Sequence, residues 1–207
     1  MPEFASRDPL TPAFWDERFE RGFTPWDKGG VPQALREFVA ASKRPLRTLI
    51  PGCGAAYELA FLSEAGWDAS AIDFSPAAVA RARAAVGPWA ARVEQADFFA
   101  WHSAQPLDLI YERAFLCALP RAMWAQVAAR WAALLAPGAR LAGFFFFDDA
   151  TRGPPFGIAP DALQDLLAPY FERIDDAPVA DSIAVFDSKE RWQVWQRKQS
   201  PHAKGAP

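Results

Sequence analysis

The feature that most constrains this chain is an apolar strand that runs into a glycine turn. Residues 48–58 read TLIPGCGAAYE, and Asp73 ends the next apolar stretch, 19 residues beyond Gly54. Glycines let the backbone approach a ligand closely, and a carboxylate at the end of the next strand can bind the hydroxyls of a ribose. A strand–helix–strand unit of this length brings the two features together. The pattern therefore predicts a nucleoside site on an α/β sheet.

The identity of the nucleoside depends on the third position of the glycine motif. Dinucleotide sites use G-x-G-x-x-G, in which the third glycine allows close packing around a pyrophosphate. Tyr57 occupies that position here. A bulky ring disfavours NAD and favours a ligand without phosphates, such as S-adenosylmethionine, although Gly52 and Gly54 alone would also suit an ordinary turn. Methyl transfer is the leading interpretation, and an NAD-dependent oxidoreductase is the weaker one.

The composition favours a single domain that binds a small molecule. With 207 residues, 51% of them hydrophobic, the chain can bury a core of moderate size. There are 22 basic and 25 acidic residues, a net charge of −3, and no basic cluster that would suit nucleic acid. The longest apolar run, residues 141–147, is shorter than the roughly 20 residues that a membrane span needs. We therefore expect a cytoplasmic monomer that does not bind membranes.

Alternating strand and helix signals predict a doubly wound sheet. Before it, residues 13–42 are predicted to form two short helices around a turn rich in glycine and proline. Strands are expected near 47–51, 69–73, 92–96, 107–112 and 139–147, and helices near 55–65, from Pro76, from Pro120 to Pro137-Gly138 and over 160–170. Two late segments, 182–186 and 191–197, are predicted to pair as antiparallel strands at the sheet edge. The predicted class is α/β, mostly parallel, with an antiparallel end.

Seven short motifs give a more specific indication. They are FWD at residues 14–16, TPWD at 24–27, PGCG at 51–54, DFF at 97–99, DLIYER at 108–113, CALP at 117–120 and GPPF at 153–156. In this order they resemble the thiopurine methyltransferase family over residues 14–197, and within it the bacterial halide, thiocyanate and thiol methyltransferases. The resemblance implies a class I, Rossmann-like methyltransferase fold that binds S-adenosylmethionine. We expect one domain over 13–198, with a helical lid at 13–42 and flexible ends at 1–12 and 199–207.

The same resemblance assigns cofactor contacts to nine residues. They are Trp15, Phe19 and Trp26 in the lid, Gly52 and Gly54 in the turn beneath the methionine part, Asp73 at the ribose, Asp97 and Phe98 at the adenine, and Arg113 at the end of the fourth strand. Trp26 and Arg113 are also expected to position the substrate. Simpler roles stay open, because Asp97 could cap a helix, Trp15 could belong to the core and Arg113 could pair with Glu112.

The chemistry follows from what the sequence lacks. Methyl transfer from a sulfonium is an in-line displacement that depends on positioning and leaves S-adenosylhomocysteine. The histidines are limited to His102 and His202, so no general base is assigned, and an acceptor that is already anionic is favoured, such as a halide, thiocyanate or thiol. Cys53 and Cys117 are far apart, so neither a metal site nor a disulfide is expected. Two alternatives are a thiopurine or aromatic thiol methyltransferase and a module that binds the cofactor without catalysis.

Overall fold

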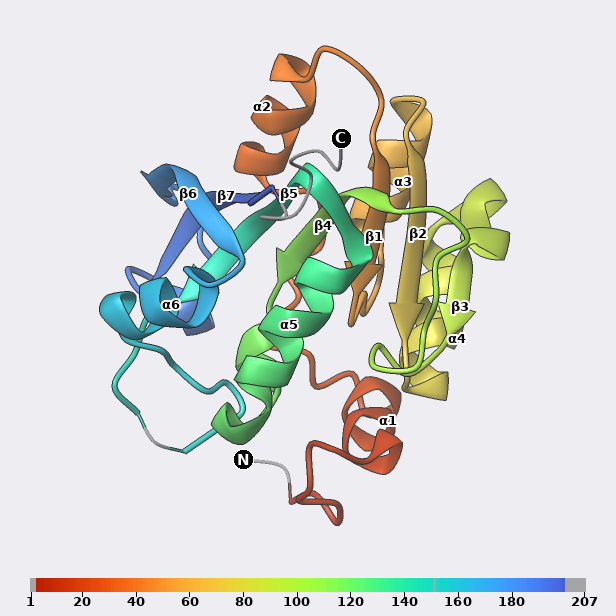
Figure 1. Cartoon of the computed structure of the whole chain (residues 1–207). Coiled ribbons are helices and arrows are strands. Elements are labelled where there is room, and N and C mark those ends of the chain that lie inside the picture. Colours follow the sequence, from red (N-terminus) through yellow and green to blue (C-terminus); the bar gives the residue numbers. More distant parts are fainter. Residues whose placement is uncertain (1–2, 151, 200–207) are drawn as a thin grey trace, which may run out of the picture.

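A seven-stranded sheet forms the centre of the molecule. The computed structural model describes residues 3–150 and 152–199, and within them the strands are arranged in the order β3-β2-β1-β4-β5-β7-β6 (Figure 1). Strands β1 to β5 are parallel to their neighbours, whereas β7 runs antiparallel to β5 and β6 antiparallel to β7. The strands are β1 (Arg47–Pro51), β2 (Asp68–Asp73), β3 (Val93–Gln95), β4 (Leu107–Arg113), β5 (Leu135–Phe146), β6 (Phe171–Pro178) and β7 (Glu190–Arg197).

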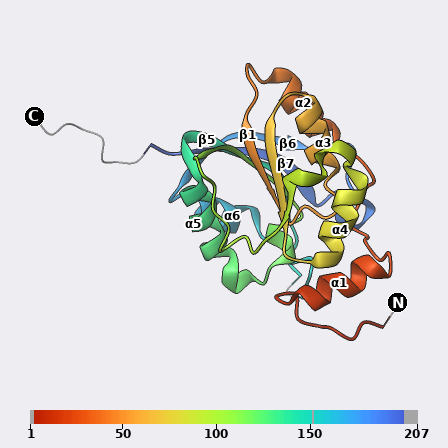
Figure 2. The same cartoon turned by 90° about the vertical axis from the view of Figure 1, so that its right-hand side faces the viewer.

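Helices cover both faces of this sheet. Figure 2 shows α5 (Trp124–Leu134) and α6 (Pro160–Leu167) on one face, and α2 (Gln33–Ala41), α3 (Tyr57–Glu64) and α4 (Pro76–Ala85) on the other. Two buried clusters fill the layers, one including Trp131 and Ile110, the other including Leu59 and Leu109. Adjacent residues of β4 thus point to opposite faces, and both faces are apolar, as expected for a buried parallel strand. The predicted mostly parallel α/β fold is confirmed.

The start of α4 also anchors the first helix. Ser75 is the N-cap, because its Oγ accepts a hydrogen bond from the Ala78 N–H at 3.1 Å, and Pro76 fits the first turn. Helix α1 (Pro12–Glu20) reaches this cap through Asp16, whose Oδ1 accepts from Ser75 Oγ at 2.6 Å and from the Ala77 N–H at 3.0 Å. These bonds hold α1 below the carboxyl ends of the strands in the view of Figure 1.

The predicted strand over 182–186 is wrong. Ala184–Phe186 form a short 3₁₀ helix, and the antiparallel partner of β7 is β6 instead. Ile183 and Phe186, three residues apart, are buried together against Cys117 and Phe146, which suits one helical turn. Strand β6 is an edge strand, exposed along most of its length, and therefore lacks the alternating apolar pattern by which strands are predicted.

Two further boundaries differ from the prediction. The helix expected from Pro120 begins as a 3₁₀ turn over Arg121–Met123, and α5 ends at Leu134, before Pro137-Gly138, which already belong to β5. The helix expected over 160–170 ends at Leu167, because Phe171 enters the sheet. His202 and the predicted tail beyond residue 199, like residues 1–2, lie outside the described residues.

Candidate functional site

A cavity of about 770 Å³ lies at the carboxyl ends of the parallel strands, beside α1. Separate segments of the chain contribute to it, and all nine residues predicted as cofactor contacts line it: Trp15, Phe19, Trp26, Gly52, Gly54, Asp73, Asp97, Phe98 and Arg113. We call the part formed by Gly52, Gly54, Asp73, Asp97 and Phe98 the strand-end wall. We call the part formed by Ala114, Cys117, Pro154, Pro155 and Phe186 the loop wall.

The glycine turn needs its glycines. Gly52 and Gly54 have φ angles of +59° and +53°, in the left-handed region that favours glycine. A Cβ on Gly52 would lie 2.7 Å from Cδ2 of Phe115, so this position also has no room for a side chain. The turn therefore presents bare backbone to the cavity.

Asp73 is tied to this turn. Its Oδ2 accepts a hydrogen bond from the Gly54 N–H at 3.2 Å, and its Oδ1 accepts from the Ser75 N–H at 3.0 Å. Burial raises the pKa of Asp73 to about 6, while the backbone donors favour its charged form. Each carboxylate oxygen can accept more than one hydrogen bond, so the group can still receive donors from a ligand in the cavity.

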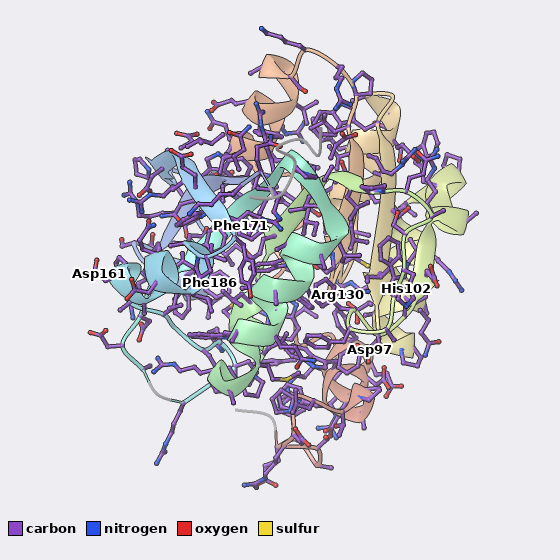
Figure 3. The ribbon with its side chains drawn as sticks, in the orientation of Figure 1. Asp97, His102, Arg130, Asp161, Phe171 and Phe186 are labelled. Atoms are coloured by element: carbon purple, nitrogen blue, oxygen red, sulfur yellow. The ribbon has the colours of Figure 1, made fainter. Side chains whose placement is uncertain are left out.

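Asp97 opens the turn that follows β3. Its Oδ1 accepts from the Phe99 N–H at 2.9 Å and holds a turn, not the helix whose cap the sequence left open, and the residue also lines the cavity. Arg130, on α5, holds the turn by donating to the carbonyl oxygens of Phe98, at 3.4 Å, and of Trp101. Figure 3 labels Asp97 and Arg130 on this side of the sheet. The buried Phe98 ring lies 4.9 Å from the ring of Phe115, which joins the turn after β3 to the glycine turn.

The first part of the segment predicted as a lid contributes aromatic rings to the cavity. The Trp26 ring centroid lies 5.5 Å from that of Trp15 and 6.0 Å from that of Phe19, both in edge-on geometry. Trp15 Nε1 donates to the Pro9 carbonyl at 2.8 Å. Trp26 also packs against the cluster that contains Cys117 and Phe186, so it links α1 to the loop wall. Helix α2, by contrast, packs on the sheet face and does not line the cavity.

Arg113 brings a cation with unsatisfied donors to the cavity. Its guanidinium carbon lies 4.1 Å from the centroid of the Phe144 ring, and its buried Nη1 and Nη2 have no hydrogen-bond partner among the described residues. The pair with Glu112 that the sequence left open is not formed. Instead, Glu112 Oε1 accepts from the N–H groups of Phe115 and Leu116, at 3.0 and 2.9 Å. A cation with free donors is suited to bind an anion.

Sequence reasoning missed Glu58 and Tyr111 as cavity residues. Glu58 lies in the first turn of α3, only four residues after Gly54, and its carboxylate accepts from Tyr111 Oη at 3.3 Å. Burial raises the pKa of Glu58. The position of Glu58 just after the glycine turn was a usable signal, because the start of that helix must lie beside the ligand. The contact with Tyr111, 53 residues later, has no local signal.

Two negative findings concern the described part of the chain. It holds no group of three or more His, Cys, Asp and Glu side chains that could bind a metal ion. None of the helices in residues 3–150 and 152–199 is long and apolar enough to cross a membrane.

Comparison with known sequences gives a consistent result. The family model for thiopurine S-methyltransferase matches residues 10–198. A probable thiol methyltransferase 2 of Arabidopsis thaliana is 31% identical over 201 residues, covering 91% of this chain and 87% of the relative. Thiocyanate methyltransferase 1 of Brassica oleracea is 29% identical over 190 residues, covering 88% of this chain and 84% of the relative.

Solved structures show a similar fold. The 1,6-didemethyltoxoflavin-N1-methyltransferase of Burkholderia thailandensis, solved with S-adenosylhomocysteine bound, matches with a TM-score of 0.71 and 18% identity, covering 96% of this chain and 94% of that one. Magnesium protoporphyrin IX methyltransferase of Synechocystis PCC 6803, also solved with S-adenosylhomocysteine, matches with a TM-score of 0.71 and 16% identity, covering 92% and 100%. At such identities the likeness shows the fold alone.

Proposed function

Because the chain belongs to the thiopurine S-methyltransferase family, we propose that it transfers the methyl group of S-adenosylmethionine to a small soft nucleophile. The observation that carries the proposal is the buried Asp73 carboxylate, bonded to the Gly54 N–H inside a cavity that also contains Asp97 and the lid tryptophans. A buried carboxylate beside a glycine turn can bind the hydroxyls of a ribose, and the surrounding groups can contact the rest of the cofactor.

The strand order supports one direction for the cofactor. Strands β3, β2 and β1 are adjacent in the sheet, so the turn with Asp97, the Asp73 carboxylate and the glycine turn succeed one another along its edge. We assign the adenine to Asp97 and Phe98, the ribose to Asp73 and the methionine part to the glycine turn. The sulfonium then faces the loop wall, at the side where Trp26 packs against it, and the rings of Trp15 and Trp26 there favour a positive charge.

The acceptor is assigned to the loop wall, beyond β1 in the direction of β4 and β5. The side chains there are apolar or weakly polar, and Arg113 at the end of β4 supplies a cation that can serve the cofactor carboxylate or an anionic acceptor. The acceptor attacks the methyl carbon in line with the carbon–sulfur bond, which breaks and leaves a neutral thioether. A soft anion needs no base, and His102 does not line the cavity.

The relatives are named for thiol, thiocyanate and thiopurine methylation, and we propose a halide, thiocyanate or thiol as acceptor. A bulky aromatic thiol is the second candidate, favoured by the apolar side chains Phe186, Pro154 and Pro155. We further propose that the protein acts as a monomer in the cytoplasm. Its two cysteines are free thiols, as is usual in a reducing compartment.

An acceptor panel tests the proposal. Purified protein is incubated with S-adenosylmethionine and iodide, thiocyanate, hydrosulfide or thiophenol, and the methylated product is measured by headspace gas chromatography together with S-adenosylhomocysteine. We expect turnover with at least one soft nucleophile, and the ratio of thiophenol to thiocyanate turnover ranks the two candidates. Methylation of an oxygen nucleophile, with none of the soft ones reacting, would overturn the proposal.

A further inference from the structure

A buried carboxylate lies across β5 from Arg113. In the register of the sheet, Arg113 pairs with Phe144 of β5. Glu190, which begins β7 and is only 7% exposed, pairs with Phe146 of the same strand. Paired residues, and residues two apart on one strand, point to the same face of a sheet. The two charges therefore share one face and lie on either side of β5.

These two charges interact through space. Burial raises the pKa of Glu190, and Arg113 opposes this rise more strongly than any other neighbouring group does. Glu190 Oε1 accepts a hydrogen bond from Ser182 Oγ at 2.8 Å. The Nη1 and Nη2 atoms of Arg113 have no hydrogen-bond partner in the described part of the chain. Glu190 thus compensates the charge of Arg113 and leaves these donors free.

The charge of Arg113 also acts on three other carboxylates. Asp181 forms an ion pair with Lys28 at 2.8 Å, which balances its charge. Glu112 is adjacent to Arg113 in β4 and so points to the opposite face of the sheet. Glu58 lies at the start of α3, beside the glycine turn. The carboxylate at the start of β7 is therefore the one best placed to act on an acceptor near β4 and β5.

The same carboxylate acts on the loop wall. Its bond to Ser182 joins the two ends of a segment, and within this segment Phe186 packs against Cys117. Burial raises the pKa of the Cys117 thiol, and the negative charges of Glu112 and Glu190 add to this effect. Both Cys117 and Phe186 line the cavity. A charge that disfavours a thiolate at this wall also disfavours an anionic acceptor beside it.

We propose that Glu190 determines acceptor specificity, because it compensates Arg113 in the free enzyme and limits how tightly the cavity holds an anion. A buried cation without a counter-charge is costly, so the carboxylate stabilises the protein before an acceptor binds. The same charge repels an anionic acceptor and has little effect on a neutral one. This inference rests on the proposed function, since it concerns the acceptor of the methyl group. It assigns a role to a residue that does not itself line the cavity.

Acceptor kinetics at pH 8 and saturating S-adenosylmethionine separate charge from shape. Thiocyanate is measured by its KM, or by its inhibition constant against a faster acceptor, and methyl thiocyanate is the neutral competitor of similar shape. Glu190→Gln removes the charge but keeps an oxygen that can accept from Ser182. Glu190→Asp keeps the charge but shortens the side chain. The control is Asp187→Asn, which removes an exposed carboxylate from the same segment.

The expected effect is specific to the anion. Glu190→Gln strengthens thiocyanate binding by about 5- to 10-fold and leaves methyl thiocyanate and S-adenosylhomocysteine within about 2-fold. Glu190→Asp and Asp187→Asn leave the thiocyanate constant within about 2-fold. A purely structural role would give the reverse order, with the larger change in Glu190→Asp.

A double variant provides a second test that leaves no unpaired charge behind. Arg113→Gln is compared with Arg113→Gln/Glu190→Gln, which lacks both charges. We expect the double variant to bind thiocyanate about 5-fold more tightly than Arg113→Gln alone, because the repelling carboxylate has been removed. If Glu190→Gln does not fold, this comparison decides the question.

Four results count against the inference. Thiocyanate binding that is unchanged or weaker in Glu190→Gln overturns it, and so does an equal strengthening of methyl thiocyanate. A larger change in Glu190→Asp than in Glu190→Gln also overturns it, as does a double variant that binds thiocyanate no better than Arg113→Gln. If folded wild-type protein methylates no acceptor at all, the proposed function itself fails, which the other outcomes do not imply.

Discussion

The strand-end wall and the loop wall of the cavity are built in different ways. In the strand-end wall, polar groups are fixed by the backbone, as when the Asp73 carboxylate accepts from the N–H groups of Gly54 and Ser75. The loop wall consists of Ala114, Cys117, Pro154, Pro155 and Phe186, and Trp26 and Phe146 pack against it. The first wall suits a ligand that never changes, whereas the second can change its shape through single side chains. We therefore expect that cofactor and acceptor recognition can be altered separately.

The largest expected effect comes from Asp73→Asn. An amide in place of the carboxylate weakens the hydrogen bonds to the ribose hydroxyls and to the Gly54 N–H. We expect the dissociation constant of S-adenosylhomocysteine to rise at least about 100-fold, because hydrogen bonds to a charged group are the strong ones. Calorimetry measures it, and Asp68→Asn, an exposed residue at the start of the same strand, is the control. An unchanged constant would remove Asp73 from the site.

Gly52→Ala tests whether the strand-end wall depends on bare backbone. The new Cβ meets Phe115 at 2.7 Å, and the backbone has φ of +59°. Gly66→Ala is the matched control, because Gly66 has φ of +81° but no atom within 4 Å of its Cβ. Both variants lose about 1 kcal/mol of stability from the left-handed backbone, and Gly52→Ala loses about 1–2 kcal/mol more through the clash. Equal melting temperatures for the two variants would show that Phe115 moves away freely.

Glu112 lies next to the loop wall, and we expect it to make the free energy of unfolding depend on pH. Burial raises the pKa of this carboxyl to about 7, against about 4.3 in an unfolded chain. The folded chain therefore holds the proton more tightly, so the free energy of unfolding falls as the pH rises from about 4 to above 7. We expect Glu112→Gln to remove about 2 kcal/mol of this fall between pH 5 and 8, as measured by urea denaturation.

The control for this prediction is Glu172→Gln, which removes an exposed carboxylate from β6. It should keep the wild-type dependence of stability on pH. If Glu112→Gln also keeps the wild-type dependence of stability on pH, the Glu112 side chain has an ordinary pKa. The N–H groups of Phe115 and Leu116 then bond to a carboxylate that is ionised from pH 5 to 8.

The smallest effect is expected from Phe186→Leu, in the loop wall. The KM for the acceptor should rise about 5-fold, because a smaller side chain packs less closely against it, while the dissociation constant of S-adenosylhomocysteine stays within about 2-fold. Phe171→Leu shortens a buried ring that does not line the cavity, and both rings are labelled in Figure 3. A matching rise in KM for both variants would mean that the change acts through general stability.

The same two walls explain how much of the site the sequence could predict. The strand-end wall follows from local patterns, because Gly54 and Asp73 belong to one strand–helix–strand unit, and parallel strands end at one edge of a sheet. The motifs at 117–120 and 153–156 identified two segments of the loop wall, but they did not predict that these segments contact each other. The N–H of Phe156 bonds to the carbonyl of Cys117 at 2.7 Å, a contact that only the folded chain creates.

The secondary structure was predictable in segments where the pattern of apolar residues was clear. Strands β1 and β4 are buried along most of their length and have apolar centres, Leu49-Ile50 and Leu109-Ile110. Strand β6 could not be predicted, because it is an edge strand whose exposed polar residues do not alternate with apolar ones. The strand predicted over 182–186 was wrong because Ile183 and Phe186 are apolar but belong to a helical turn. Glu58 was overlooked although its position just after the glycine turn was a usable signal, whereas its contact with the distant Tyr111 had no local one.

A crystal structure of the protein with S-adenosylhomocysteine tests the central claim most directly. We expect both ribose hydroxyls to lie within about 3 Å of the Asp73 carboxylate, with the adenine at Phe98 and the thioether sulfur facing the loop wall. A ligand whose ribose lies away from Asp73, or whose sulfur faces away from the loop wall, would contradict it.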